Sequence, residues 1–154
     1  MLRSKSSPAQ LEDHLGYWLR RVSNEVSAAF ARAIQAEGVS VAEWVALRLL
    51  HDHEKQTLGS VARTTGMTRG AMSKVLDKLE AKSLAVREQN PDDDRVQWLA
   101  LTRAGQRLVP RLAALADRND DHFFSCLSAN DQADLRRILQ KLSRTHGLNE
   151  TPVD

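Results

Sequence analysis

The segment TRGAMSKVLDKLEAK at residues 68–82, followed by LAVRE at 84–88, QNPDDDR at 89–95 and VQWLAL at 96–101, decides the fold. Apolar residues of the first segment recur every three or four positions, which predicts a helix capped by Thr68 that ends near Lys82. Its expected buried residues are Met72, Val75, Leu76 and Leu79. The later segments alternate around a polar tip and predict a β-hairpin. We expect its inward residues to be Leu84, Val86, Leu99 and Leu101.

A shorter helix is predicted directly before this segment. Thr57 can cap a helix over 58–65, and Gly66 permits a sharp turn before the next helix begins. Helix, short turn, helix and hairpin in this order predict a winged helix-turn-helix. In that motif the second helix fits the major groove of DNA.

Long helices are expected on both sides of this motif. An apolar stripe at helical spacing predicts a helix over 11–36, with Gly38 at its C-terminal stop. The capping-box spacing of Ser40 and Glu43 predicts a helix as far as about His53. After the hairpin, further helices are expected from Thr102 to about Leu127 and over about 129–146. The predicted fold class is therefore mainly α with a small β-hairpin.

The predicted organisation separates a DNA-binding lobe from a helical dimerisation region. The lobe is expected over 39–101, and the dimerisation region over 11–38 and 102–148. Polar tails are expected at 1–10 and 149–154. The chain of 154 residues is 42% hydrophobic and 27% charged, which predicts a folded protein, and its net charge of +2 permits nucleic-acid binding without proving it.

The outer face of the 68–82 helix carries the residue types that contact DNA. Arg69 can bind guanine in a bidentate manner, and Ser73 can reach a base or a phosphate. Gly70 would let the backbone approach closely. Lys74, Lys78 and Lys82 recur every four residues and form a ridge suited to phosphates, although such a ridge alone is typical of a solvated helix face.

The hairpin tip offers one further cation. Asp92, Asp93 and Asp94 are poorly suited to phosphates, but Arg95 could enter a narrow minor groove. We expect Asp93 to pair with Arg95 across the turn and to orient its guanidinium.

Segment 58–105 resembles the MarR family of bacterial transcription regulators. The resemblance is carried by residues 68–80, by NPDDDR at 90–95 and by LALTRAG at 99–105, and the family's Asp-x-Arg wing signature falls on Asp93 and Arg95. It implies a homodimer, interlocked through its first and last two helices, that binds a pseudo-palindromic duplex. It also implies an affinity for DNA that is lowered by small aromatic or phenolic anions. The implied DNA-binding residues are Thr68, Arg69, Gly70, Ser73, Lys74, Lys78, Asp93 and Arg95.

Two positions depart from the family pattern. Ser83 stands where glycine usually ends the recognition helix, which here is the helix at 68–82. This departure predicts a less tight turn from that helix into the wing, which is the hairpin. Asp94 stands where a second arginine is common, so that the minor-groove contact would depend on Arg95 alone.

Trp18, Arg48 and His51 are the candidate effector-binding residues. Trp18 would supply an aromatic wall, and Arg48 or His51 could meet an anion. The alternative, which we favour for each residue, places Trp18 in the dimer core and the other two on the surface.

Other classes of function have little support in the sequence. Cys126 is the lone cysteine, which indicates an intracellular, cytoplasmic protein, and its aromatic neighbours predict a buried, inert thiol. His51 and His53 are two residues apart on a helix and point to different faces, so no metal site is expected. No cofactor, membrane segment or enzyme site is expected. The alternative function is a winged-helix module that binds another protein and little DNA.

Overall fold

The computed structural model describes residues 8–154; positions 1–7 of the predicted N-terminal tail lie outside this range. The chain is mainly helical with one two-stranded antiparallel sheet, so the predicted fold class is confirmed. The elements are η1 (Leu11–Asp13), α1 (Leu15–Gln35), α2 (Val41–Asp52), α3 (Leu58–Thr65), α4 (Arg69–Ala81), β1 (Ala85–Gln89), β2 (Gln97–Leu101), α5 (Arg103–Phe124) and α6 (Ala129–Thr145).

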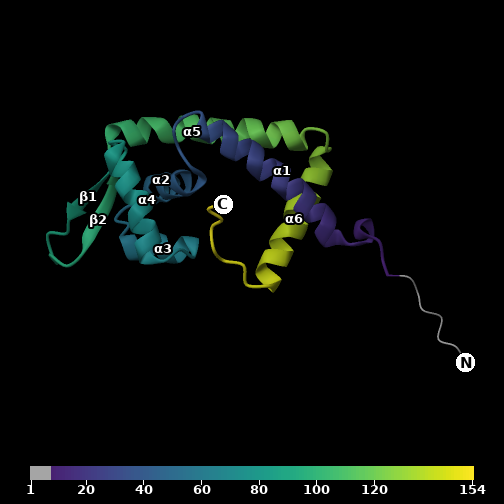
Figure 1. Cartoon of the computed structure of the whole chain (residues 1–154), viewed down its shortest axis with the longest axis horizontal. Helices are drawn as coiled ribbons and strands as arrows, with labels where there is room; N and C mark the ends of the chain where they lie inside the picture. The colour runs from purple at the N-terminus through teal and green to yellow at the C-terminus, as the bar shows by residue number, and fades with distance from the viewer. Residues whose placement is uncertain (1–7) are drawn as a thin grey trace, which may run out of the picture.

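Helix α5 connects the two ends of the molecule. Figure 1 shows α2, α3, α4 and the hairpin gathered at one end of α5 and α6 at the other end, while α1 lies along α5. This arrangement separates a compact lobe, which contains the helix-turn-helix and the hairpin, from the long helices.

The starts of α2, α3, α4, α5 and α6 follow from local hydrogen bonding, as the sequence predicts. The Oγ atom of Ser40 accepts the backbone N–H of Glu43, and the Glu43 carboxylate accepts the Ser40 N–H in return. Hydroxyl caps of this kind satisfy backbone donors that have no partner inside a helix. The same cap is formed at the starts of α3, α4, α5 and α6 by Thr57, Thr68, Thr102 and Ser128.

The first predicted helix is interrupted near its start. Leu11–Asp13 forms a 3₁₀ turn, and His14 has an extended backbone before α1 begins at Leu15. The Trp18 indole N–H donates to the Glu12 carbonyl across this break at 2.9 Å.

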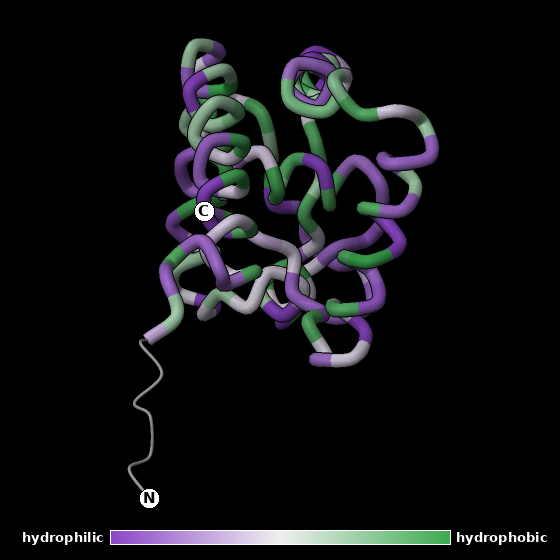
Figure 2. Tube along the Cα trace, turned by 90° about the vertical axis from the view of Figure 1, so that its right-hand side faces the viewer, coloured by the Kyte–Doolittle hydropathy of each residue, from purple (hydrophilic) through white to green (hydrophobic). Residues whose placement is uncertain are grey.

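The core lies in the lobe and where α5 packs on it. The predicted inner face of α4 is buried as expected, and Leu47, Val61 and Leu112 pack with it from α2, α3 and α5. In Figure 2 the helices carry both green and purple residues, as amphipathic helices do.

The hairpin has a regular register, and it corrects the predicted orientation of Val86. Ala85 pairs with Leu101 and Arg87 with Leu99, so Arg87 shares a face with buried Leu99 while Val86 lies on the opposite face, 38% exposed. Leu84 is buried but precedes the strand. The prediction for Val86 was wrong because it extended the two-residue alternation of a strand back to Leu84, where the chain is still in a turn.

The turn that leads from α4 into the hairpin is tight, contrary to the expectation for Ser83. Ser83 has a left-handed backbone with φ of 56°, and the Leu84 N–H donates to the Leu79 carbonyl at 2.9 Å. The Thr102 hydroxyl also donates to the Ser83 carbonyl at 2.7 Å. Serine therefore adopts the conformation that glycine usually supplies at a helix end, at a cost in backbone strain.

Substituting glycine at this position is expected to stabilise the protein. Ser83→Gly should raise the free energy of unfolding by roughly 0.5–1 kcal/mol, because the left-handed conformation strains a residue with a Cβ atom. Thermal unfolding at a fixed protomer concentration measures the effect. Ser83→Ala, which retains Cβ, is the control and should bring no gain; equal midpoints for Ser83→Gly and the wild type would contradict the prediction.

The long helices leave apolar side chains uncovered in the single chain. Leu15, Trp18, Leu19 and Val22 of α1 are exposed, and so are Ile138, Leu139 and Leu142 of α6. Contiguous apolar stripes of this kind mark surfaces that another chain covers. Among residues 8–154, no helix is both long enough and apolar enough to cross a membrane.

Two C-terminal features differ from the expected picture. Helix α5 ends at Phe124 and not near Leu127, so that Cys126 lies in the following turn and is exposed; the prediction of a buried thiol was wrong for the single chain. The segment 149–154 forms no helix or strand, but it lies against α3, where the Thr151 N–H donates to the Thr64 carbonyl at 2.8 Å.

Candidate nucleic-acid interface

Helices α3 and α4 are joined by a short turn that fixes their geometry. Gly66 ends α3 with a left-handed φ of 69°, and the Thr68 hydroxyl begins α4 by accepting the Ala71 N–H at 3.1 Å. The two helices pack on each other, and the inner residues of α4 anchor it to the core. The N-terminal turn of α4 is thereby held at the surface of the lobe.

The outer face of α4 places most of the predicted DNA-binding residues in solvent. Thr68, Arg69, Lys74 and Lys78 are exposed, and a Cβ atom added at Gly70 would meet open space. The Arg69 guanidinium lies against Gly59 of α3, where a larger residue would crowd it. Within residues 8–154, neither Arg69 nor either of these lysines forms an ion pair. This face therefore carries cations that form no direct ion pair with a described carboxylate.

Lys82 does not belong to this ridge, which corrects the prediction of three equivalent lysines. Its ammonium donates to the Gly38 carbonyl at 2.7 Å and to the Glu43 carboxylate at 2.6 Å. The Glu43 side chain is only 3% exposed. Lys82 therefore fastens the end of α4 to the start of α2, because a buried carboxylate requires a partner.

Ser73 is the most enclosed of the predicted contact residues. It is half-buried, and Arg87 of β1 donates to its hydroxyl at 3.4 Å and to its carbonyl at 3.5 Å. Sequence reasoning missed Arg87. Its one signal was its position in the strand, where a cation shares the inner face with Leu99.

The wing tip presents Arg95 to solvent, but not in the predicted way. Asp93 accepts the backbone N–H of Arg95 at 3.0 Å and makes no ion pair with its guanidinium. An aspartate commonly bonds to the backbone two residues on, and this stabilises a turn. Asn90 makes a similar bond to the Asp92 N–H at 2.9 Å. Asp93 thus shapes the tip, and the Arg95 side chain remains exposed.

The predicted effector residues fall into two separate clusters. Arg48 and His51, at the end of α2, both contact Asp52, at 2.8 and 3.1 Å. Hydrogen bonds from His51 and then Arg48 hold the pKa of Asp52 below its ordinary value. Trp18 instead contacts Glu12, Tyr17 and Arg21 near the start of α1.

His51 also borders a hollow between α2 and the hairpin. Leu50, Leu99, Leu101 and Gln106 line the same hollow. Across residues 8–154, no group of three or more histidine, cysteine or carboxylate side chains is arranged to hold a metal ion.

A helix-turn-helix followed by a hairpin, with exposed cations on its second helix and at the hairpin tip, defines a winged-helix DNA-binding protein. The sequence model of the MarR family matches residues 37–96. The chain is 30% identical over 128 residues to the HTH-type transcriptional repressor Rv2887 of Mycobacterium tuberculosis. This alignment covers 83% of this chain and 92% of Rv2887. The chain belongs to the MarR family.

Solved structures agree with this assignment over most of the chain. The transcriptional repressor CouR of Rhodococcus jostii RHA1, bound to a 23-mer DNA duplex, superposes on this chain with a TM-score of 0.79 at 28% sequence identity. The superposition covers 91% of this chain and 99% of the CouR chain. Rv2887 in complex with salicylic acid gives a TM-score of 0.66 at 29% identity, covering 90% of this chain and 98% of its own.

Proposed function

We propose that this protein is a transcription repressor that binds an operator as a homodimer and releases it when a small aromatic acid binds. The observation that carries the proposal is the set of exposed cations on α4, together with an exposed Arg95 at the wing tip. The proposed role is that of a regulator and not of an enzyme, and a regulator of bacterial promoters acts in the cytoplasm.

Each protomer would contact two grooves of the duplex. The N-terminal half of α4 is the part of a recognition helix that meets base edges, so we assign Arg69 and Ser73 to the major groove. Lys74 and Lys78 would bind flanking phosphates, and Arg95 would enter the minor groove, where the potential is most negative. Three residues would support these contacts. Thr68 caps the start of α4, Gly70 leaves the helix face open, and Asp93 stabilises the turn at the wing tip.

Dimerisation supplies the second half of the operator contact. We assign the uncovered apolar stripes of α1 and α6 to the dimer interface, with the dimerisation region at 11–38 and 102–148 and the DNA-binding lobe at 39–101. A two-fold dimer presents two copies of α4, so the expected operator is a pseudo-palindrome with half-sites about one helical turn apart.

Relatives with bound aromatic ligands support the effector. Rv2887 was solved with salicylic acid, and a CouR structure contains p-coumaroyl-CoA. In this chain His51 and the cation of Lys55 line a hollow between α2 and the hairpin, while Arg48 lies outside its lining. His51 and Arg48 both contact Asp52. An aromatic carboxylate would compete with Asp52 for them. Trp18 lies apart from these residues, near the start of α1, and is not assigned to this hollow.

Selection of bound sequences from a random duplex pool tests the proposal. We expect one pseudo-palindromic motif, a steep loss of affinity with rising salt, and release by millimolar salicylate. Arg95→Ala should weaken binding to the selected duplex roughly tenfold and reduce the salt slope by about 1.

The control for Arg95→Ala is Arg111→Ala. It also removes one positive charge, but from an ion pair with Glu37 between α5 and the end of α1. Its affinity for the selected duplex should match that of the wild type. Recovery of no motif at moderate salt, with a folded dimer, would favour a protein-binding module over a DNA-binding regulator.

A further inference from the structure

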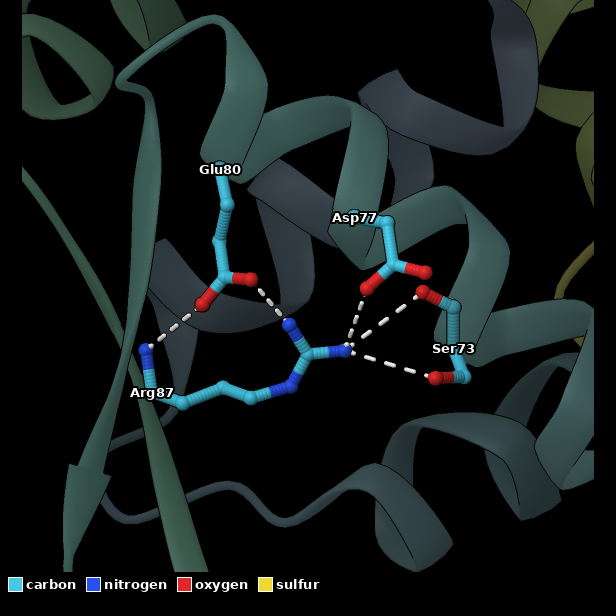
Figure 3. A network of polar contacts seen from close by, with 4 residues as sticks. All are labelled: Ser73, Asp77, Glu80 and Arg87. Carbon is cyan, nitrogen blue, oxygen red and sulfur yellow. Dashed lines mark hydrogen bonds and ion pairs between the residues drawn. The ribbon is translucent and has the colours of Figure 1, made fainter.

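Arg87 of β1 joins the two elements that contact DNA in the proposed function, on which this inference rests. Figure 3 shows its side chain reaching from the hairpin to α4. Its guanidinium donates to the carboxylates of Glu80 and Asp77, the latter at 3.0 Å, and its backbone N–H donates to Glu80 at 3.1 Å. The same guanidinium also contacts Ser73 through its hydroxyl and carbonyl oxygens.

The three partners of Arg87 form one stripe on α4. Ser73, Asp77 and Glu80 follow each other at four- and three-residue steps, so they lie on the same face of the helix. Arg87 occupies the space between this stripe and the hairpin, with its side chain 20% exposed. A planar guanidinium that binds carboxylates at both ends has a fixed orientation, which a flexible lysine would not have.

This network holds the hairpin at a set distance from the recognition helix. On the other side, the hairpin is tied to the loop before α3, because the Leu99 N–H donates to the Gln56 carbonyl at 2.8 Å. Arg87 and Leu99 are directly paired in the sheet. The two strands of the wing are therefore held at paired positions, β1 through Arg87 and β2 through Leu99. Arg95 projects from the free tip of the wing.

We propose that Arg87 is a positioning residue for DNA recognition, which fixes the spacing between the base-reading face of α4 and Arg95. A duplex offers its major and minor grooves at one separation, so a displaced wing loses the contact that the operator requires. Non-specific binding depends on charge near phosphates and tolerates such a displacement. The network consequently governs specificity more than total affinity.

Electrostatics and positioning predict opposite results for one variant. Asp77→Asn with Glu80→Gln removes both carboxylates at nearly constant shape, so that two negative charges near the DNA are lost. By charge alone, this double variant would bind every duplex at least as tightly as the wild type. If Arg87 positions the wing, the ratio of affinities for the selected operator and for random duplex should fall at least tenfold, while random duplex is bound as well or better.

The matched control is Asp134→Asn with Glu37→Gln. It removes two carboxylates from ion pairs with Arg137 and Arg111 outside the lobe and makes the same charge change. Its affinity ratio should stay within twofold of the wild-type value. Arg87→Lys, which keeps the charge but cannot bridge both carboxylates, should show a smaller fall of about threefold.

Circular dichroism and unfolding midpoints establish that each variant is folded. An unchanged ratio in both the Asp77→Asn, Glu80→Gln variant and Arg87→Lys would overturn the positioning role. A wild-type protein without any preferred duplex would instead refute the proposed function, so the two failures are distinguishable.

Discussion

Replacing Lys82 with methionine is expected to lower the free energy of unfolding by roughly 2 kcal/mol. The substitution retains the length of the side chain and its helix propensity but removes the ammonium group. Among residues 8–154, the Glu43 carboxylate, 3% exposed, would then keep only the Ser40 N–H as a donor, at 3.2 Å. The Gly38 carbonyl would lose its bond from Lys82 as well.

The cost arises from an unpaired buried charge and not from the lost ion pair as such. Glu43→Gln in the Lys82→Met background should therefore recover about half of the lost stability, because a neutral amide is less costly to bury. Arg137→Met, which breaks the exposed pair with Asp134, is the control and should change stability by less than about 0.5 kcal/mol.

Urea unfolding at a fixed protomer concentration measures these differences, since dimerisation contributes to apparent stability. A Lys82→Met midpoint equal to that of the control would show that water replaces the ammonium without loss. It would also remove the reason to exclude Lys82 from the DNA-binding ridge.

The same residue illustrates what the sequence could and could not predict. The four-residue step of Lys74, Lys78 and Lys82 is a local property of one helix, and it correctly placed all three on the polar side of α4. Their partners depend on which other helix lies nearby. The packing of α2 against the end of α4 gives Lys82 a carboxylate partner, which distinguishes it from Lys74 and Lys78.

Capping and periodicity rules predict the helix starts and the buried face of α4 in the lobe. The caps at Ser40, Thr57, Thr68 and Thr102 depend on hydrogen bonds between residues three apart, and the buried face of α4 depends on helical periodicity alone. Both kinds of signal are present in a short window of sequence, so the sequence alone predicts the helix starts and the buried residues of the lobe.

The errors occurred where tertiary contacts or turn geometry decide. Val86 was placed inward because the strand was started too early, and Ser83 adopts a left-handed turn that its residue type does not indicate. Asp93 bonds to the backbone of Arg95 and not to its guanidinium. Arg87 was missed because its role arises only when β1 folds against α4. The residues assigned to DNA stay predictions, since their partner is a second macromolecule.

Gly105→Ala is expected to disrupt the fold strongly, although it adds only one methyl group. Gly105 lies in the first turn of α5, and a Cβ atom there would lie 2.2 Å from the Leu84 carbonyl oxygen and 3.3 Å from a Leu101 methyl. That carbonyl also accepts the Thr102 N–H at 3.1 Å, at the junction of α4, the hairpin and α5. The backbone must move to admit the methyl group, because the obstacle is main chain and not a flexible side chain.

We expect Gly105→Ala to cost roughly 2–3 kcal/mol, at the upper part of the range for overpacking, in spite of the better helix propensity of alanine. Gly70→Ala is a matched control, because Gly70 also lies in the first turn of a helix and its added Cβ would meet open space. It should leave stability unchanged or raise it by up to about 1 kcal/mol.

The two glycines should also differ in their effect on DNA binding. A displaced start of α5 moves β2, which pairs with β1 and carries the wing, so Gly105→Ala should lower the ratio of specific to non-specific affinity even in the fraction that remains folded. Gly70→Ala adds a methyl group to the proposed DNA-facing surface and should weaken binding of the selected duplex without loss of stability. Equal unfolding midpoints for the two variants would show that the junction is not rigid, and the wing could then not be held at the fixed spacing from α4 that specific recognition requires.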